Sequence, residues 1–364
     1  MKRLNLIIKN YRHYFNRTLL RLCVIALLLA IVFSGCKKDN DIHNNSTVDA
    51  STIKFVLKDN FNFGGFNEML NRLQLTDSLA QKGPFTVFVP DNDAFTLVGI
   101  VAPYNTNSIY SYYFTGSQLL NRARYYIIND DVLLNKLPLV QNKAYLTRTG
   151  GYIYISKYIN GGDTVITANG IRLVSTDNAA SNGIVQVMPQ LINPETYHTI
   201  SEYIHTDTSL TLFAAAMSRS GLETSFLQGK DQYTVLGLSN AAMQASAKLG
   251  KNLGLSMMDS VLNADPAKLA VILKDHIIGG MNFEGDLYRQ GAADPAGIAA
   301  LSGNKIRIGG NPASPHAMTF QGTGNTIPAK IALSADPNTG SAVNNANIPC
   351  GNGVVHIINQ VLIP

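Results

Sequence analysis

Hydrophobic and polar residues follow two periods along the chain, and the order of these periods occurs twice. Apolar residues at i, i+3, i+4 and i+7 predict an amphipathic helix containing Phe66 and another containing Leu210. Period-two alternation over residues 152–159 (YIYISKYI) predicts a strand, and residues 305–308 (KIRI) predict its counterpart. Helices grouped before and between strands indicate an α+β fold rather than an alternating parallel one.

Two longer stretches of the sequence are repeated in the same order. Residues 84–95 (PFTVFVPDNDAF) recur as residues 232–243 (QYTVLGLSNAAM). Residues 182–194 (NGIVQVMPQLINP) recur as residues 352–364 (NGVVHIINQVLIP). A repeat of this length indicates a tandem pair of domains rather than a solenoid.

These two stretches resemble the hallmark motifs of fasciclin-like domains. The resemblance covers about residues 50–364 and implies two tandem domains, at residues 50–195 and 196–364. It implies that each domain is a β-sandwich or wedge with a helical layer, and that the role is adhesion or extracellular binding rather than catalysis. The copies differ inside the closing motif, where Gln186 stands in the first and His356 in the second.

The closing motif is expected to cross the centre of each domain. Its strand-forming residues are therefore predicted to be buried: Val185, Val187 and Leu191 in the first copy, and Val355, Ile357 and Val361 in the second. The Asn-Gly pair that precedes each strand predicts a tight turn, because Gly accepts positive φ at little cost.

The run Asp91-Asn92-Asp93 allows two interpretations. Its side-chain oxygens are of the kind that binds Ca²⁺. The second copy has Ser239-Asn240-Ala241 instead, which favours Asn92 and Asn240 as caps at the start of a helix.

The N-terminus has the pattern of an export signal. Six basic residues and no acidic ones lie in residues 1–35, and an apolar run at 22–33 leads to Ser-Gly-Cys36. The run is too short to cross a bilayer, which takes about 20 residues. The residues before Cys36 resemble the lipobox of bacterial lipoproteins, which implies a lipid on Cys36 after removal of residues 1–35. Residues 36–49 are polar and predict a flexible tether.

Composition narrows the classes of partner. The chain has 29 Lys and Arg against 24 Asp and Glu, and removal of the six leader charges leaves 23 against 24. Nucleic acid is excluded as a partner because the exported body has no basic excess from which to build a binding patch. Cys350 is the one cysteine left besides Cys36, so no disulfide and no thiolate metal clip is expected.

One spacing suggests metal chemistry. His198, Glu202 and His205 fall at i, i+4 and i+7, so a helix would place them on one face, where they could bind a metal ion. The alternative is a solvated helix face, which we favour because no further motif closes the site. His276 and His356 are interpreted as hydrogen-bonded structural residues.

The predicted strand at 152–159 is the candidate binding surface. It places Tyr152, Tyr154 and Tyr158 on one face, and in the second copy the same face bears Lys305 and Arg307. Because charged side chains are almost never buried without a partner, that face should meet solvent, where tyrosines suit sugars and protein partners. The alternative is that the tyrosines pack under a loop or against the other domain.

Together these patterns predict a non-enzymatic binding or adhesion lipoprotein with no cofactor, no metal and no catalytic residue. We expect it in the outer membrane, lipid-anchored and facing the cell surface, where it binds an extracellular glycan or an envelope protein. It would then be accessory to glycan or nutrient capture. The alternatives are a metal-assisted hydrolase using His198, Glu202 and His205, and a purely structural spacer.

Overall fold

The computed structural model describes most of the chain after the predicted leader. The described residues are 49–102, 115–249 and 253–363, apart from 313, 315–316, 333, 336–341 and 344. The predicted signal, the lipid site Cys36 and the tether up to residue 48 lie outside the described residues. Within the described part, none of the helices combines the length and the apolar character needed to cross a bilayer.

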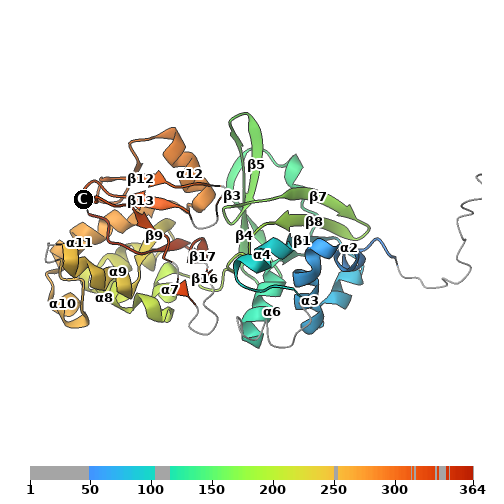
Figure 1. Cartoon of the computed structure of the whole chain (residues 1–364), viewed down its shortest axis with the longest axis horizontal. Coiled ribbons are helices and arrows are strands. Elements are labelled where there is room, and N and C mark those ends of the chain that lie inside the picture. The colour runs from blue at the N-terminus through green and yellow to red at the C-terminus, as the bar shows by residue number, and fades with distance from the viewer. Residues whose placement is uncertain are drawn as a thin grey trace, which may run out of the picture. The chain divides into compact units, whose positions relative to one another are not determined.

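The first repeat, here called domain 1, starts with helices and continues with two sheets (Figure 1). Its helices are α2 (Ile53–Asp59), α3 (Gly64–Arg72), α4 (Asn92–Leu97) and α6 (Gly116–Tyr125), with 3₁₀ turns η1 (Phe61–Phe63), η2 (Thr76–Ala80) and η3 (Leu134–Lys136). Its strands are β1 (Phe85–Pro90), β2 (Ile127–Ile128), β3 (Val140–Leu146), β4 (Tyr152–Asn160), β5 (Asp163–Ala168), β6 (Ile171–Arg172), β7 (Ser175–Ala180) and β8 (Gly183–Met188).

The second repeat, domain 2, follows the same general order with additional elements, among them α12 and the β15–β16 pair. Its helices are α7 (Ile200–Thr206), α8 (Thr211–Ser220), α9 (Asn240–Ala245), α10 (Met258–Asn263), α11 (Pro266–Leu273) and α12 (Glu284–Ala293), with short turns η4 (Thr208–Leu210), η5 (Glu223–Leu227, a π-turn), η6 (Ser246–Leu249) and η7 (Lys274–His276). Its strands are β9 (Tyr233–Leu238), β10 (Ile277–Gly279), β11 (Ile298–Ala299), β12 (Lys305–Gly309), β13 (Thr319–Gln321), β14 (Ala329–Lys330), β15 (Ser334–Ala335), β16 (Ala342–Val343), β17 (Ile348–Cys350) and β18 (Gly353–Ile358).

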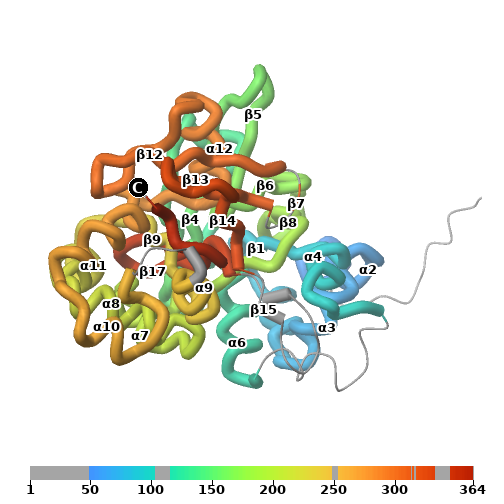
Figure 2. The backbone as a smooth tube through the Cα atoms, turned by 60° about the vertical axis from the view of Figure 1, so that its left-hand side comes forward, coloured from blue at the N-terminus to red at the C-terminus, as the bar shows by residue number. Residues whose placement is uncertain are grey.

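The two repeated motifs pair with each other in both domains. In domain 1 the sheet order is β2-β1-β8-β7, and β1 runs parallel to β8, from Phe85 opposite Gly183 to Pro90 opposite Met188. Figure 2 shows β1 and β8 side by side although they are far apart in the sequence. Domain 2 repeats this arrangement as β10-β9-β18-β17. A second four-stranded sheet, β3-β4-β5-β6 or β11-β12-β13-β14, completes each α+β domain.

The Asn-Gly pair holds three segments together in each domain. The Asn182 side chain accepts a hydrogen bond from the N–H of Ile53 at 2.9 Å and donates to the carbonyls of Leu79 and Gln81, at the end of η2, at 2.8 Å each. Asn352 binds the start of α7 and the end of η5 in the same way. The glycines are required by the close approach of β1 or β9, since a Cβ on Gly353 would lie 1.9 Å from the Tyr233 carbonyl oxygen.

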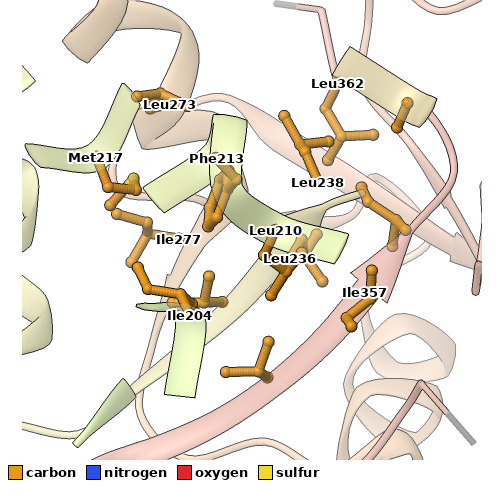
Figure 3. Close-up of a cluster of buried hydrophobic side chains, with 14 of the residues drawn as sticks. Ile204, Leu210, Phe213, Met217, Leu236, Leu238, Leu273, Ile277, Ile357 and Leu362 are labelled. Atoms are coloured by element: carbon orange, nitrogen blue, oxygen red, sulfur yellow. The ribbon is translucent and has the colours of Figure 1, made fainter. Parts of the chain in front are cut away.

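Each domain encloses its own apolar core between the helices and the sheets. The core of domain 1 runs from Ile53 to Ile192, and that of domain 2 from Ile200 to Leu362. Figure 3 shows the domain 2 core, where side chains from α7, α8 and α11 meet those of β9 and β18. The predicted helices of both copies are confirmed, as is burial of five of the six closing-motif residues: Val185, Leu191, Val355, Ile357 and Val361.

The prediction was wrong for Val187, which is only half-buried although its strand crosses the domain. Val187 packs against the core of domain 1 and also lines an open groove on the surface of that domain. Its equivalent in domain 2, Ile357, is fully buried.

The predicted helix caps were wrong by one residue. Asp91 caps α4, because its carboxylate accepts the Ala94 N–H at 2.9 Å, and Ser239 caps α9 in the same way. Asn92 instead accepts from the N–H of Gly65 at 3.0 Å and donates to the Phe61 carbonyl at 2.7 Å. It thereby ties the start of α4 to the segment before α3.

Candidate functional site

The tyrosine strand predicted from the sequence is β4, and its middle tyrosine is buried. Tyr154 is 5% exposed, and its ring centroid lies 5.7 Å from that of Phe283 in domain 2. Met281 and Val354 complete this apolar contact between the two domains. The expectation that the face meets solvent is therefore wrong at Tyr154. The alternative considered with it, packing against the other domain, describes this residue correctly.

The two flanking tyrosines differ from Tyr154. Tyr152 is 41% exposed, and Tyr158 is half-buried with the Arg289 guanidinium 5.7 Å from its ring centroid. The face is thus split, with a covered centre and an open end at Tyr152. A binding role for Tyr152 remains a prediction. In domain 2, Lys305 and Arg307 are exposed as expected.

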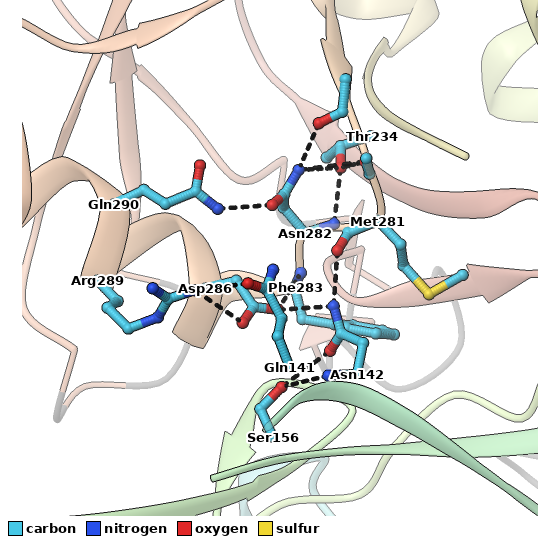
Figure 4. A network of polar contacts seen from close by, with 12 residues as sticks. Gln141, Asn142, Ser156, Thr234, Met281, Asn282, Phe283, Asp286, Arg289 and Gln290 are labelled. Carbon is cyan, nitrogen blue, oxygen red and sulfur yellow. Dashed lines mark hydrogen bonds and ion pairs between the residues drawn. The ribbon is translucent and has the colours of Figure 1, made fainter. Parts of the chain in front are cut away.

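A polar network next to Tyr154 joins the domains, and Asn142 is its centre (Figure 4). The β3–β4 register shifts between Val140 and Lys143, and Asn142 lies in this bulge with φ of 51°, a conformation that Asn tolerates. Its amide donates to the Met281 carbonyl at 2.6 Å and to Asp286 Oδ2 at 3.1 Å. Ser156 Oγ donates to Asn142 Oδ1 at 3.0 Å and fixes the orientation of the amide.

Two acidic residues at the start of α12 lie in this contact. Burial raises the pKa of Asp286, whose Oδ2 accepts hydrogen bonds from Asn142 and from the Phe283 N–H. Burial also raises the pKa of Glu284, to about 7, and its Oε2 accepts from the Asn347 amide at 2.7 Å. The cost of burying each carboxyl is reduced by these hydrogen bonds, and for Glu284 also by partial protonation near neutral pH.

Arg289 lies at the edge of the same network. Its guanidinium is 3.8 Å from Asp286 Oδ1 and donates to Gln141 Oε1 on β3 at 2.7 Å. A cavity of about 240 Å³ lies beside it, lined in part by Ser156 and Tyr158. The polar side chains at this surface bind one another, so the surface holds the two domains together.

The predicted metal spacing does not form a metal site. His198 precedes α7, and its backbone N–H donates to Glu202 Oε2 at 2.7 Å. The imidazole of His205 instead pairs with Glu223 at 2.8 Å, and that carboxylate also accepts from the Ser201 and Ser218 hydroxyls. Burial alone would raise the pKa of Glu223, but the hydrogen bonds from Ser201, Ser218 and His205 together outweigh it and lower the pKa. No cluster of three or more His, Cys, Asp or Glu suited to a metal ion exists in the described part of the chain.

The two remaining histidines of interest are buried and neutral. Burial lowers the pKa of His276 and of His356 to about 4. His276 Nε2 accepts the Leu362 N–H at 2.9 Å, while its Nδ1 donates to the Ile272 carbonyl. Both imidazoles thus hold backbone segments together, as interpreted from the sequence.

Cys350 is buried on β17, and burial raises the pKa of its thiol. A protonated buried thiol is a poor nucleophile, so this cysteine acts as a small core residue.

Sequence reasoning missed the residues that join the domains. Asn142 and Asp286 showed no motif or spacing, since neither belongs to a recurring pattern. The one local signal is the non-alternating run of residues 140–146, which breaks the strand pattern at the bulge.

Comparisons with known proteins agree with the repeated fold. The model of the fasciclin domain matches residues 61–194 and 208–364. The chain is 26% identical over 301 residues to transforming growth factor-beta-induced protein ig-h3 of Sus scrofa, covering 80% of this chain and 36% of that protein. It is 24% identical over 304 residues to periostin of Homo sapiens, covering 80% of this chain and 30% of that protein.

This chain therefore spans about a third of the length of those relatives. Among solved structures, the FAS1 domain pair from the insect cell adhesion molecule fasciclin I covers 83% of this chain and 97% of its own, at 15% identity and a TM-score of 0.37.

Proposed function

Because the chain belongs to the fasciclin domain family, we propose that it is a non-enzymatic binding and adhesion module anchored at the cell surface by a lipid on Cys36. The observation that carries this proposal is that the side chains capable of acid–base or metal chemistry are already hydrogen-bonded within the fold. The candidate imidazoles and carboxylates are engaged within the fold. His205 pairs with the Glu223 carboxylate, and the others bind backbone groups, hydroxyls or amides: Glu223, His276, Glu284, Asp286 and His356. Such groups support the fold rather than a reaction.

The N-terminal sequence supports the location. Residues 34–36 follow an apolar run and a basic segment, and the polar residues after Cys36 would give the body distance from the membrane. Several acyl chains are needed for stable attachment, since one chain alone binds membranes only weakly. We place the protein in the outer membrane with its body outward, where it would bind a glycan or an envelope protein and assist nutrient capture.

The experiment that tests anchoring compares wild type with Cys36→Ser in fractionated cells. Wild type is expected in the membrane pellet after a high-salt wash, whereas Cys36→Ser is expected in the soluble fraction or unprocessed. Protease added to intact cells should digest the wild-type body. A Cys36→Ser protein that pellets like wild type would contradict lipid anchoring.

The test of binding uses the full-length chain in detergent, coupled to beads and exposed to solubilised envelope and to purified surface polysaccharides. Saturable retention of one class of ligand supports a binding module. Retention of neither class would favour the structural spacer instead.

A further inference from the structure

Domain 1 has a groove of about 500 Å³ that the sequence analysis did not anticipate. It lies between η1, the start of α4 and the β7–β8 pair. The floor is apolar and the rim is polar. The lining residues are Val56, Asn60, Asn62, Phe63, Asp91, Asn92, Asp93, Val174, Ser175, Asn178, Val185 and Val187.

Domain 2 fills the equivalent space with its own side chains. The residue at the place of Val56 is Tyr203, which is buried and whose hydroxyl donates to Asp207 at 2.8 Å. Likewise Asn178, which is exposed, is replaced by the buried Ile348. The fold therefore does not require the groove, and the choice of side chains in domain 1 leaves it open.

The rim has hydrogen-bonding groups that the fold does not use. The Asn62 amide and the Asp93 carboxylate have no hydrogen bond from other residues in the described part of the chain. Asp91 is half-buried, and this burial raises the pKa of its carboxyl although the Ala94 N–H is bound to it. Two carboxylates and several amides, with no Lys, Arg or His among the lining residues, disfavour an anionic ligand.

An exposed aromatic residue adjoins this rim in the sequence. Phe61 lies between the lining residues Asn60 and Asn62 and is 94% exposed. Its backbone is held in place because Asn92 donates to its carbonyl at 2.7 Å. A fully exposed Phe ring on a fixed backbone contributes nothing to the core, and it offers a flat apolar face to a ligand.

We propose that the groove binds a neutral carbohydrate, with a sugar face stacked on Phe61 and sugar hydroxyls bonded to Asn62, Asp91 and Asp93. A sugar ring presents C–H groups on its faces and hydroxyls at its edges, which matches an apolar floor with an amide and carboxylate rim. This proposal rests on the proposed binding function and names its ligand class. A basic peptide is the competing occupant that the acidic rim would tolerate.

The test is calorimetric titration of the full-length chain in detergent with neutral glucan, mannan, xylan, galactan and fructan oligosaccharides, and with a lysine-rich peptide. At least one oligosaccharide is expected to bind. Phe61→Ala should weaken that binding at least tenfold without changing the melting temperature, since the ring makes no buried contact. Val56→Tyr, which copies Tyr203, should fill the groove and weaken binding to a similar degree.

Thr208→Ala is the matched control, because Thr208 is exposed at the place of Phe61 in domain 2 and should leave binding unchanged. Binding of the peptide alone, or of no oligosaccharide, would overturn the proposal. Carbohydrate binding that survives both Phe61→Ala and Val56→Tyr would also overturn it, while leaving the proposed binding function intact. Conversely, a chain that binds sugar through the groove but is not membrane-anchored would contradict only the surface location.

Discussion

His356 and Gln186 make the same pair of hydrogen bonds at equivalent places in the two domains. Each accepts from the backbone N–H of a residue in the left-handed conformation, Asn347 at 3.3 Å from His356 and Asp177 at 2.8 Å from Gln186. Each also donates to a backbone carbonyl, at 3.0 Å for His356 and 3.2 Å for Gln186. The difference between the closing motifs is therefore structurally conservative at neutral pH, but only one of these side chains can be protonated.

This relationship predicts that His356→Gln makes the protein more resistant to acid. The folded pKa of His356 is lowered from 6.5 to about 4, so the unfolded state binds more protons between these values. Wild type therefore loses stability as pH falls through that window, by roughly 2 kcal/mol between pH 7 and pH 5 from this site alone. Gln at position 356 can keep both hydrogen bonds and stays neutral.

Urea unfolding at pH 7 and pH 5 checks this expectation. The variant should resemble wild type at pH 7 and have the higher midpoint at pH 5. A variant that loses as much stability as wild type between the two pH values would show that His356 is not the group responsible.

Glu284→Gln is expected to change the pH profile in the opposite direction. The folded pKa of Glu284 is raised from 4.5 to about 7, so the folded state holds this proton more tightly than the unfolded state. Its contribution to stability is full below pH 4.5 and is lost as pH rises through 7, which amounts to roughly 2–3 kcal/mol between pH 5 and pH 8. The variant has no such loss, and unfolding curves at the two pH values measure the difference. An equal loss of stability between pH 5 and pH 8 in variant and wild type would show that Glu284 is not the group responsible.

Tyr154 and Tyr152 provide a matched pair on one strand. Tyr154→Ser removes a ring that packs on Phe283 and a hydroxyl that donates to Glu195 at 2.6 Å. We therefore expect the free energy of unfolding to fall by about 3–5 kcal/mol. Tyr152→Ser should cost less than about 1 kcal/mol, because that side chain is exposed. Thermal unfolding of the two variants checks the contrast. Equal melting temperatures would show that Tyr154 does not support the contact between domains.

Much of the fold could be predicted because its signals are local. The helix containing Phe66 and the strand at 152–160 follow from the spacing of apolar residues within single elements. The repeat identified the two motifs that form β1 and β8, and β9 and β18, but it did not predict that these strands pair with each other. The cap residues were misplaced by one position because Asp91 and Asn92 both have side chains suited to capping.

The features that could not be predicted depend on contacts between distant elements. Burial of Tyr154 is caused by Phe283 in the other domain, and the alternation within β4 contains no information about that neighbour. The candidate groove depends on Val56 in α2 being smaller than Tyr203 in α7, and no pattern within a single element indicates this difference. A sequence pattern describes a single helix or strand, whereas a surface groove is lined by residues from several helices and strands.

Truncation of Ile357 and of Val187 tests this difference between the domains. The two residues are equivalent in the repeat, but Ile357 is fully buried in the core of domain 2 while Val187 lines the groove of domain 1. Ile357→Ala leaves a closed cavity and should cost roughly 2–5 kcal/mol. Val187 packs against the core but also borders the open groove, so Val187→Ala removes less buried surface and should cost less than about 1.5 kcal/mol. Urea midpoints of both variants decide the matter: equal losses would mean that domain 1 closes its groove in solution, and an unchanged midpoint for Ile357→Ala would show that the repeat register is wrong.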